Sequence, residues 1–303
     1  MRPIEWGMLA LLSTFWGGSF FFIEIALRGF HPFTLVFLRV ALAAMILVCV
    51  VYLSGLRLPS GLREWGTYLI LGAINNAIPF SLIVWGQTRI DSGSAAIFNA
   101  TTPIFAGIMA HFLTSDEKLN MRKILGMLVG FLGVYLMMSP ELKDGLSWRG
   151  FGQIAVLGAA ASYALAGIFA KRFKGDSPLV TATGMLICSS VLIFPAALLV
   201  DSPWAQRPSF AAAGAVVALA TVGTAAAYVL FFRILSTAGA TNVLLVTFLV
   251  PIGALVLGVG VLHEAIHPEE YAGMGMIFLG LAFIDGRIFA RMRRGAGGPG
   301  LLS

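Results

Sequence analysis

The chain has 303 residues, of which 58% are hydrophobic and only 11% are charged. Such a composition excludes a soluble globular protein, because the apolar surface cannot all be buried in a water-soluble core, and it predicts an integral membrane protein. The net charge of +6 is explained by membrane topology and contact with anionic lipid head groups, so no nucleic-acid partner is expected.

Ten apolar segments follow one another along the chain, and we expect each to cross the roughly 30 Å of membrane hydrocarbon as a helix. They cover residues 6–27, 33–53, 65–87, 94–113, 124–138, 151–170, 179–200, 210–235, 241–262 and 271–289. The first segment is too long for a signal-peptide core and has no small-residue cleavage site after it, so it should remain as a helix. The predicted fold class is all-α integral membrane, with ten transmembrane helices.

An eight-residue stretch of the fifth segment returns in the tenth. GMLVGFLG begins at Gly126 and GMGMIFLG begins at Gly273, an offset of 147 residues. Further pairs at this offset, or with one extra residue, are Trp16 with Tyr163, Glu117 with Glu264, and Pro103 with Pro251. Because each copy would hold an odd number of spans, the second copy must enter the bilayer upside down. The sequence therefore predicts a 5+5 inverted repeat.

Three regions follow from this repeat. We expect a first five-helix repeat over residues 1–144, an inverted second repeat over 145–290, and a disordered cytoplasmic tail over 291–303, which is rich in Gly and Arg.

Basic residues indicate the orientation of the chain. If the amino terminus faces the cytoplasm, fourteen of the twenty Lys and Arg residues lie on the cytoplasmic side, five lie on the other side, and Arg39 lies within the second span. The positive-inside rule then places both termini in the cytoplasm of a protein of the inner (plasma) membrane.

Several stretches resemble a known superfamily. They are WGGSFFF in the first segment, FLRVALA around Arg39, Pro103 followed by LTSDEKL and GMLVGFLGVYL, and Pro251 followed by LHEAIHPEEYAGMGMIFLG. Over essentially its whole length the chain resembles the drug/metabolite transporter superfamily, specifically its ten-span EamA-type family. In general appearance it is most similar to bacterial exporters of amino acids, aromatic ones included, so the resemblance implies an alternating-access exporter.

Prolines near the centres of the fourth and ninth segments, Pro103 and Pro251, are candidate helix breaks with a role in gating. A broken helix offers free backbone groups and half-helix dipoles to a polar solute. A simple kink that packing absorbs is the alternative interpretation.

Polar side chains on two segments predict the wall of a cavity. Asn99 and Thr102 share one helical face of the fourth segment, and Asn76 and Phe80 share one on the third. Asn75 lies about a hundred degrees away from that face, so we expect it to bond to a neighbouring helix. Polar groups at membrane depth seldom face lipid, although ordinary hydrogen bonding between helices would also satisfy them.

Aromatic residues extend the predicted site to other segments and partly follow the repeat. Aromatic walls with a few polar groups suit solutes that have an apolar side chain and a polar head, whereas packing against lipid is the alternative for each ring alone. The predicted substrate-binding set is Trp16, Phe20, Asn76, Phe80, Asn99, Thr102, Tyr163, Thr224 and Tyr228.

Two charged residues lie clearly inside spans, Glu24 in the first and Arg39 in the second. We interpret them as a structural ion pair between antiparallel neighbours. The first segment has no carboxylate at mid-depth, where the related small multidrug exporters use a glutamate to exchange protons for cationic drugs. That mechanism is therefore disfavoured.

These observations favour export of small amphiphilic metabolites, above all amino acids with apolar or aromatic side chains. A multidrug or other metabolite exporter of the same superfamily is the alternative, and a channel or membrane scaffold is the alternative outside transport. An enzyme is not expected, because HExxH, GxSxG and paired intramembrane aspartates are absent from the sequence. Neither cofactor nor metal is predicted. The expected partners are a small-molecule substrate and the lipid bilayer, with a monomer as the simplest assembly.

Overall fold

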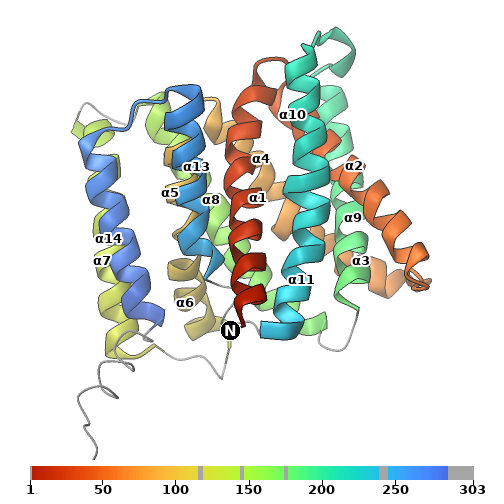
Figure 1. The fold of residues 1–303 in the computed structure, drawn as a ribbon, viewed down its shortest axis with the longest axis horizontal. Helices are drawn as coiled ribbons and strands as arrows, with labels where there is room; N and C mark the ends of the chain where they lie inside the picture. The colour runs from red at the N-terminus through yellow and green to blue at the C-terminus, as the bar shows by residue number, and fades with distance from the viewer. Residues whose placement is uncertain (1, 115–118, 144–146, 174–176, 239–244, 286–303) are drawn as a thin grey trace, which may run out of the picture.

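The computed structural model describes residues 2–114, 119–143, 147–173, 177–238 and 245–285, which form helices and connecting turns without a strand. The helices run side by side as a bundle (Figure 1). The boundary predicted at residues 144 and 145 and the tail predicted over 291–303 lie outside the described residues.

Ten helical spans follow in chain order. The first half contains α1 (Pro3–Leu27), α2 (Pro32–Leu53), a third span of α3 (Leu62–Gly72), the π-helix η1 (Ala73–Ala77) and α4 (Ile78–Gln87), a fourth span of α5 (Ser92–Asn99) and α6 (Thr102–Leu113), and α7 (Met121–Lys143). The second half contains α8 (Trp148–Phe169) with the 3-10 turn η2 (Ala170–Phe173), α9 (Pro178–Leu199), the turn η3 (Pro203–Ala205), an eighth span of α10 (Phe210–Ala220), the π-helix η4 (Thr221–Ala226) and α11 (Ala227–Ala238), then α13 (Val246–Leu262) and α14 (Pro268–Asp285).

Length and composition make these spans suitable for a membrane. Among the described residues, eight helical stretches are long and apolar enough to cross it, and α13 is a shorter apolar helix. The remaining span, α14, is apolar between acidic residues at its two ends. The fold class is therefore all-α with multiple spans, as the sequence predicts.

Local sequence explains where several helices begin. Proline is the first residue of α1, α2, α9 and α14, a position where its fixed φ fits the helix and its missing N–H costs nothing. The side chain of Ser147 accepts a hydrogen bond from the backbone of Gly150 and caps α8, and Ser209 caps α10 in the same way.

The repeated glycine motif packs against its own copy. A Cβ atom added to Gly126 would lie 2.6 Å from the carbonyl oxygen of Gly280, and one added to Gly133 would lie 2.6 Å from that of Gly273. Only glycine lets two backbones approach this closely. Because the first glycine of one copy meets the last of the other, α7 and α14 run antiparallel (Figure 1).

Contacts between helices also follow the repeat. Helix α1 packs against α13 and against α10 and α11, while its counterpart α8 packs against α5 and α6 and against α4. The counterparts α2 and α9 pack against each other. Exchange of each helix for its counterpart thus leaves the main contacts in place, which is the pattern that an inverted repeat requires. Sequence neighbours α1 and α2, by contrast, touch only slightly.

Candidate functional site

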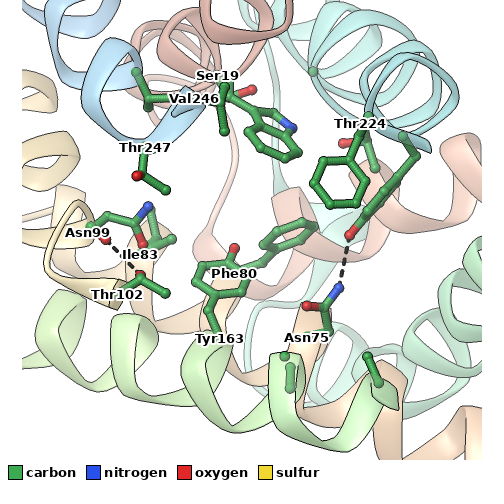
Figure 2. Close-up of a pocket in the computed structure, with 18 of the residues that line it drawn as sticks. Ser19, Asn75, Phe80, Ile83, Asn99, Thr102, Tyr163, Thr224, Val246 and Thr247 are labelled. Carbon is green, nitrogen blue, oxygen red and sulfur yellow. Dashed lines mark hydrogen bonds between the residues drawn. The ribbon is translucent and has the colours of Figure 1, made fainter. Parts of the chain in front are cut away.

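A cavity of about 690 Å³ lies among the helices, with residues from both halves in its wall. Figure 2 shows Asn99, Thr102 and Thr247 on one side of it, Asn75 and Thr224 on the other, and Phe80 and Tyr163 between. Most of the wall is apolar. Eight of the nine residues of the predicted substrate-binding set line it, namely Trp16, Phe20, Phe80, Asn99, Thr102, Tyr163, Thr224 and Tyr228.

Asn76 is the exception, and its neighbour Asn75 takes its place in the wall. Asn76 is fully buried; its Nδ2 donates to Ser189 Oγ at 3.2 Å, and its Oδ1 accepts from Tyr228 OH at 2.8 Å. Asn75 faces the cavity and donates to the Tyr228 hydroxyl at 3.1 Å (Figure 2). The expected roles of the two asparagines are therefore reversed.

The π-helix η1 explains this reversal. Both asparagines lie within Ala73–Ala77, where the chain makes i to i+5 hydrogen bonds and so holds one residue more per turn than an α-helix. A face extrapolated backwards from Phe80 with α-helical spacing is therefore wrong by one residue at this point. A second π-helix, η4, lies at the corresponding place of the eighth span and holds Gly223 and Thr224, which also line the cavity.

Aromatic rings form most of the central wall. The ring centroids of Trp16 and Phe231 are 5.6 Å apart, and those of Phe80 and Tyr163 are 6.5 Å apart. Phe231, together with Phe232, was absent from the predicted set. Both follow Tyr228 at spacings of three and four residues on α11, so the helical period starting from Tyr228 was the signal that could have found them.

The fourth span is broken beside Pro103. Helix α5 ends at Asn99 and α6 begins at Thr102, with Pro103 as its second residue. Proline has no N–H to give to the carbonyl group four residues earlier, which belongs to Asn99. The hydroxyl of Thr102 donates to that carbonyl instead, at 2.7 Å. The side-chain Oδ1 of Asn99 is buried and has no hydrogen-bond partner in the described structure, so the wall keeps an acceptor for a solute.

Pro251 lines the cavity without breaking its helix. Helix α13 is continuous from Val246 through Pro251 to Leu262. The expected break at Pro251 is therefore wrong for the described part of the ninth span. Pro251 is the sixth residue of the helix, so its missing N–H removes one of the first intrahelical hydrogen bonds only.

The expected ion pair between Glu24 and Arg39 is also wrong. Arg39 Nε donates to Thr224 Oγ1 at 2.9 Å, and its guanidinium carbon lies 3.9 Å from the centre of the Phe80 ring. Glu24, in contrast, is influenced by the charges of Glu264, Arg28 and Asp91. The reason is the packing of the spans: α1 and α2 are consecutive but touch only slightly, so antiparallel order along the chain does not bring their side chains together.

Polar contacts join the two halves at the end of the bundle opposite the amino terminus. The carboxylate of Glu264, which follows α13, accepts hydrogen bonds from Ser92 N at 3.1 Å, Ser92 Oγ at 2.9 Å and Gly93 N at 3.2 Å. A negative charge is favourable at a helix amino terminus such as that of α5. His263, with φ of 58°, ends α13 in the left-handed conformation just before Glu264 and turns the chain there.

A second carboxylate completes these contacts, which we call the distal closure. Glu270 of α14 is buried, accepts from Ser94 Oγ at 2.6 Å and pairs with Arg149 of α8 at 2.9 Å. In the other direction, the cavity wall reaches Phe173, Pro178 and Leu235, which lie near helix ends on the same side as the amino terminus (Figure 1). The cavity therefore extends towards one end of the bundle, and polar contacts hold the other end together.

A helical membrane bundle around an aromatic and polar cavity has the architecture of a small-solute transporter. The chain belongs to the EamA-like transporter family, whose model matches residues 5–139 and again residues 150–285. The double match agrees with the repeat read from the sequence. The family and the relatives below are named for transport and not for catalysis.

Relatives match nearly the whole chain. The "Uncharacterized transporter YoaV" of Bacillus subtilis (strain 168) is 23% identical over 289 residues, which cover 94% of this chain and 98% of the relative. The "Uncharacterized inner membrane transporter YedA" of Escherichia coli (strain K12) is 24% identical, with 92% of this chain and 89% of the relative covered. A solved structure, titled only as a crystal structure of a protein, superimposes with a TM-score of 0.68 at 17% identity, covering 97% of this chain and 99% of the other. That likeness concerns the fold.

Proposed function

We propose that the protein is an alternating-access exporter of small amphiphilic metabolites, with amino acids that carry apolar or aromatic side chains as its main substrates. The cavity carries this proposal. Its volume of about 690 Å³ falls within the range of small-molecule sites, roughly 300–1,000 Å³, and its wall has the usual composition of many apolar groups and a few polar ones. Rings such as Trp16 and Phe231 would hold an apolar side chain, and polar groups such as Asn99 Oδ1 would hold the head group.

Alternating access is supported by the asymmetry of the bundle. The cavity extends towards the end at which the chain begins, whereas the distal closure joins the two halves at the other end. If the two halves rock against each other, this closure has to open when the cavity turns to the opposite side. Pro103 and Pro251, both beside or in the cavity wall, would adjust during that motion.

Orientation and location belong to the same proposal. The excess of Lys and Arg on the side of the amino terminus places both termini in the cytoplasm. The cavity as described then faces the cytoplasm, where an exporter takes up its substrate. The inner membrane is the proposed location, as in the printed description of the Escherichia coli relative. We propose the monomer as the working unit.

Counterflow in proteoliposomes tests this function. Vesicles loaded with unlabelled phenylalanine should accumulate radiolabelled phenylalanine transiently, because a carrier exchanges solutes through one site. Trp16→Ala should weaken exchange of phenylalanine more than that of alanine, by about tenfold, since it removes an aromatic wall. Trp204→Ala is the matched control, because Trp204 is exposed in η3 and lies outside the cavity wall.

Other results would point to the alternatives. Flux of labelled solute without transient accumulation would indicate a channel. Exchange of cationic drugs but not of any amino acid would indicate a multidrug exporter of the same family. Equal effects of Trp16→Ala and Trp204→Ala would remove this cavity as the substrate site.

A further inference from the structure

Arg39 is a buried cation in the wall of the cavity. Only 5% of its surface is exposed, and it lies on α2 at membrane depth. Its Nε donates to the hydroxyl of Thr224, and its guanidinium group stacks on the ring of Phe80. One edge of the guanidinium is thus held by neutral groups, which fix its position.

The charge of Arg39 has no acidic partner in the part of the chain that the structure describes. The ion pairs found there join Arg2 to Glu5 and Arg149 to Asp91 and Glu270. The acceptor of Arg39 is a hydroxyl group that itself donates to the carbonyl of Leu219. A guanidinium group has five N–H donors, and the Nε–H bond to Thr224 uses one of them. The two terminal NH₂ groups therefore remain for a ligand.

An unpaired charge at this depth is costly. Intramembrane arginines normally pair with a carboxylate, bind backbone carbonyl groups or reach the interface, and those that do none of these mark pathways and binding sites. Arg39 instead borders a space large enough for a solute. Its two terminal NH₂ groups match a carboxylate in geometry as well as in charge, because the planar fork can form two parallel hydrogen bonds.

We propose that Arg39 is the carboxylate-binding residue of the cavity, so that the substrates are apolar compounds with a carboxylate group. This inference rests on the proposed transport function and narrows its substrate class. Thr224 is a positioning residue, since it holds Nε and leaves the outer edge of the fork towards the solute. The stacked ring of Phe80 holds the plane of the guanidinium group and adds a cation–π contact.

The test uses four compounds that share a phenyl ring and differ in head group. L-phenylalanine and 3-phenylpropionate have a carboxylate, whereas L-phenylalaninamide and 2-phenylethylamine have none. Binding to the purified full-length protein is measured directly by calorimetry. We expect the two carboxylates to bind at least about tenfold tighter than the two other compounds, as hydrogen bonds to charged groups require.

Variants assign this preference to Arg39. Arg39→Gln should reduce the preference to about one, and Arg39→Lys should keep part of it because the charge remains. Thr224→Val should weaken the carboxylates selectively, because the fork is no longer held. Arg89→Gln is the matched control: Arg89 stacks on Trp85 outside the cavity wall, so loss of that charge should leave the preference intact.

A second readout separates binding from a structural role. Without ligand, Arg39→Gln should unfold at the same temperature as the wild type or higher, because it removes an uncompensated buried charge. A clearly lower temperature together with an unchanged preference for carboxylates would show that Arg39 is structural and would overturn the inference. If Arg39→Gln does not fold, the comparison of Thr224→Val with wild type decides.

Failure of this inference differs from failure of the proposed function. Equal binding and exchange of phenylalanine and phenylalaninamide would overturn the role of Arg39 and leave the exporter in place. Binding of 3-phenylpropionate without phenylalanine, lost in Arg39→Gln, would support the carboxylate site and overturn amino acids as substrates. Absence of binding by both carboxylates would overturn the site.

Discussion

Tyr228 joins two adjacent asparagines that have different surroundings. Its hydroxyl donates to Asn76 Oδ1 and accepts from Asn75 Nδ2. Asn76 also bonds to Ser189 of α9, so it connects three spans deep in the bundle, while Asn75 borders the cavity. One asparagine is thus placed to hold helices together, and the other is placed to meet a solute.

Replacement of each asparagine by alanine should separate these roles. Asn76→Ala should lower stability by about 1–3 kcal/mol, because it removes two buried hydrogen bonds and leaves their partners unpaired. Asn75→Ala should cost about 0.6 kcal/mol, the usual value for one bond between membrane helices, and should change substrate preference instead. Thermal unfolding in detergent and counterflow at matched protein levels measure the two effects. The opposite assignment of effects would show that the π-helix does not set the wall of the site.

At the scale of elements, the fourth and ninth spans carry equivalent prolines with unequal consequences. Ala100 and Thr101 interrupt the fourth span before Pro103, whereas α13 continues through Pro251. Replacement of Pro103 by alanine restores the missing N–H to Asn99 and permits a continuous helix, which would remove the break that borders the cavity.

Pro103→Ala should therefore slow exchange by about tenfold, equal to about 1.4 kcal/mol in the barrier, while the protein becomes equally stable or more stable. Pro251→Ala is the matched comparison and should change exchange by less than about twofold, because its helix is already continuous. Initial rates of counterflow and unfolding temperatures give both quantities. Equal slowing by the two substitutions would instead indicate a gating role for both prolines.

Helical period and composition were sufficient to predict the spans, the repeat and most of the cavity wall. Trp16, Tyr163 and Tyr228 could be found because they lie on regular α-helices, where spacing reports direction. Asn75 and Asn76 could not be assigned, because a π-helix has no clear signature in one sequence and shifts the facing of residues by one position. The partner of Arg39 could not be found either, because it depends on which spans touch, and consecutive spans α1 and α2 hardly do.

At the scale of the whole molecule, the two halves meet through different chemistry at different places. Backbone contact between glycines joins α7 to α14 tightly along their motifs. Such a close-packed seam cannot open cheaply, because separation would leave voids in place of direct contacts. The distal closure consists of a few hydrogen bonds and one ion-pair cluster at the surface end of the bundle, so it is the contact between the halves that can open and close.

Glu264 is the residue at which this opening can be tested. Glu264→Gln keeps the shape of the side chain but removes the charge that accepts from Ser92 and Gly93, and charge-assisted bonds are roughly twice as strong as neutral ones. We therefore expect the variant to spend more time open at the distal end. A single cysteine at Ile23, in a protein freed of Cys49 and Cys188, should then react several-fold faster with a membrane-impermeant thiol reagent added on that side, since Ile23 lines the cavity and is 1% exposed in the closed form.

Glu269→Gln supplies the control for this experiment. Glu269 is exposed on α14, one residue before Glu270, so its loss changes the charge of the same surface without touching the bonds to α5. Faster labelling in Glu264→Gln but not in Glu269→Gln would place the outer gate at the distal closure. Equal rates in both variants and in the parent protein would mean that Glu264 anchors a static contact, and that the two halves separate elsewhere when the cavity changes sides.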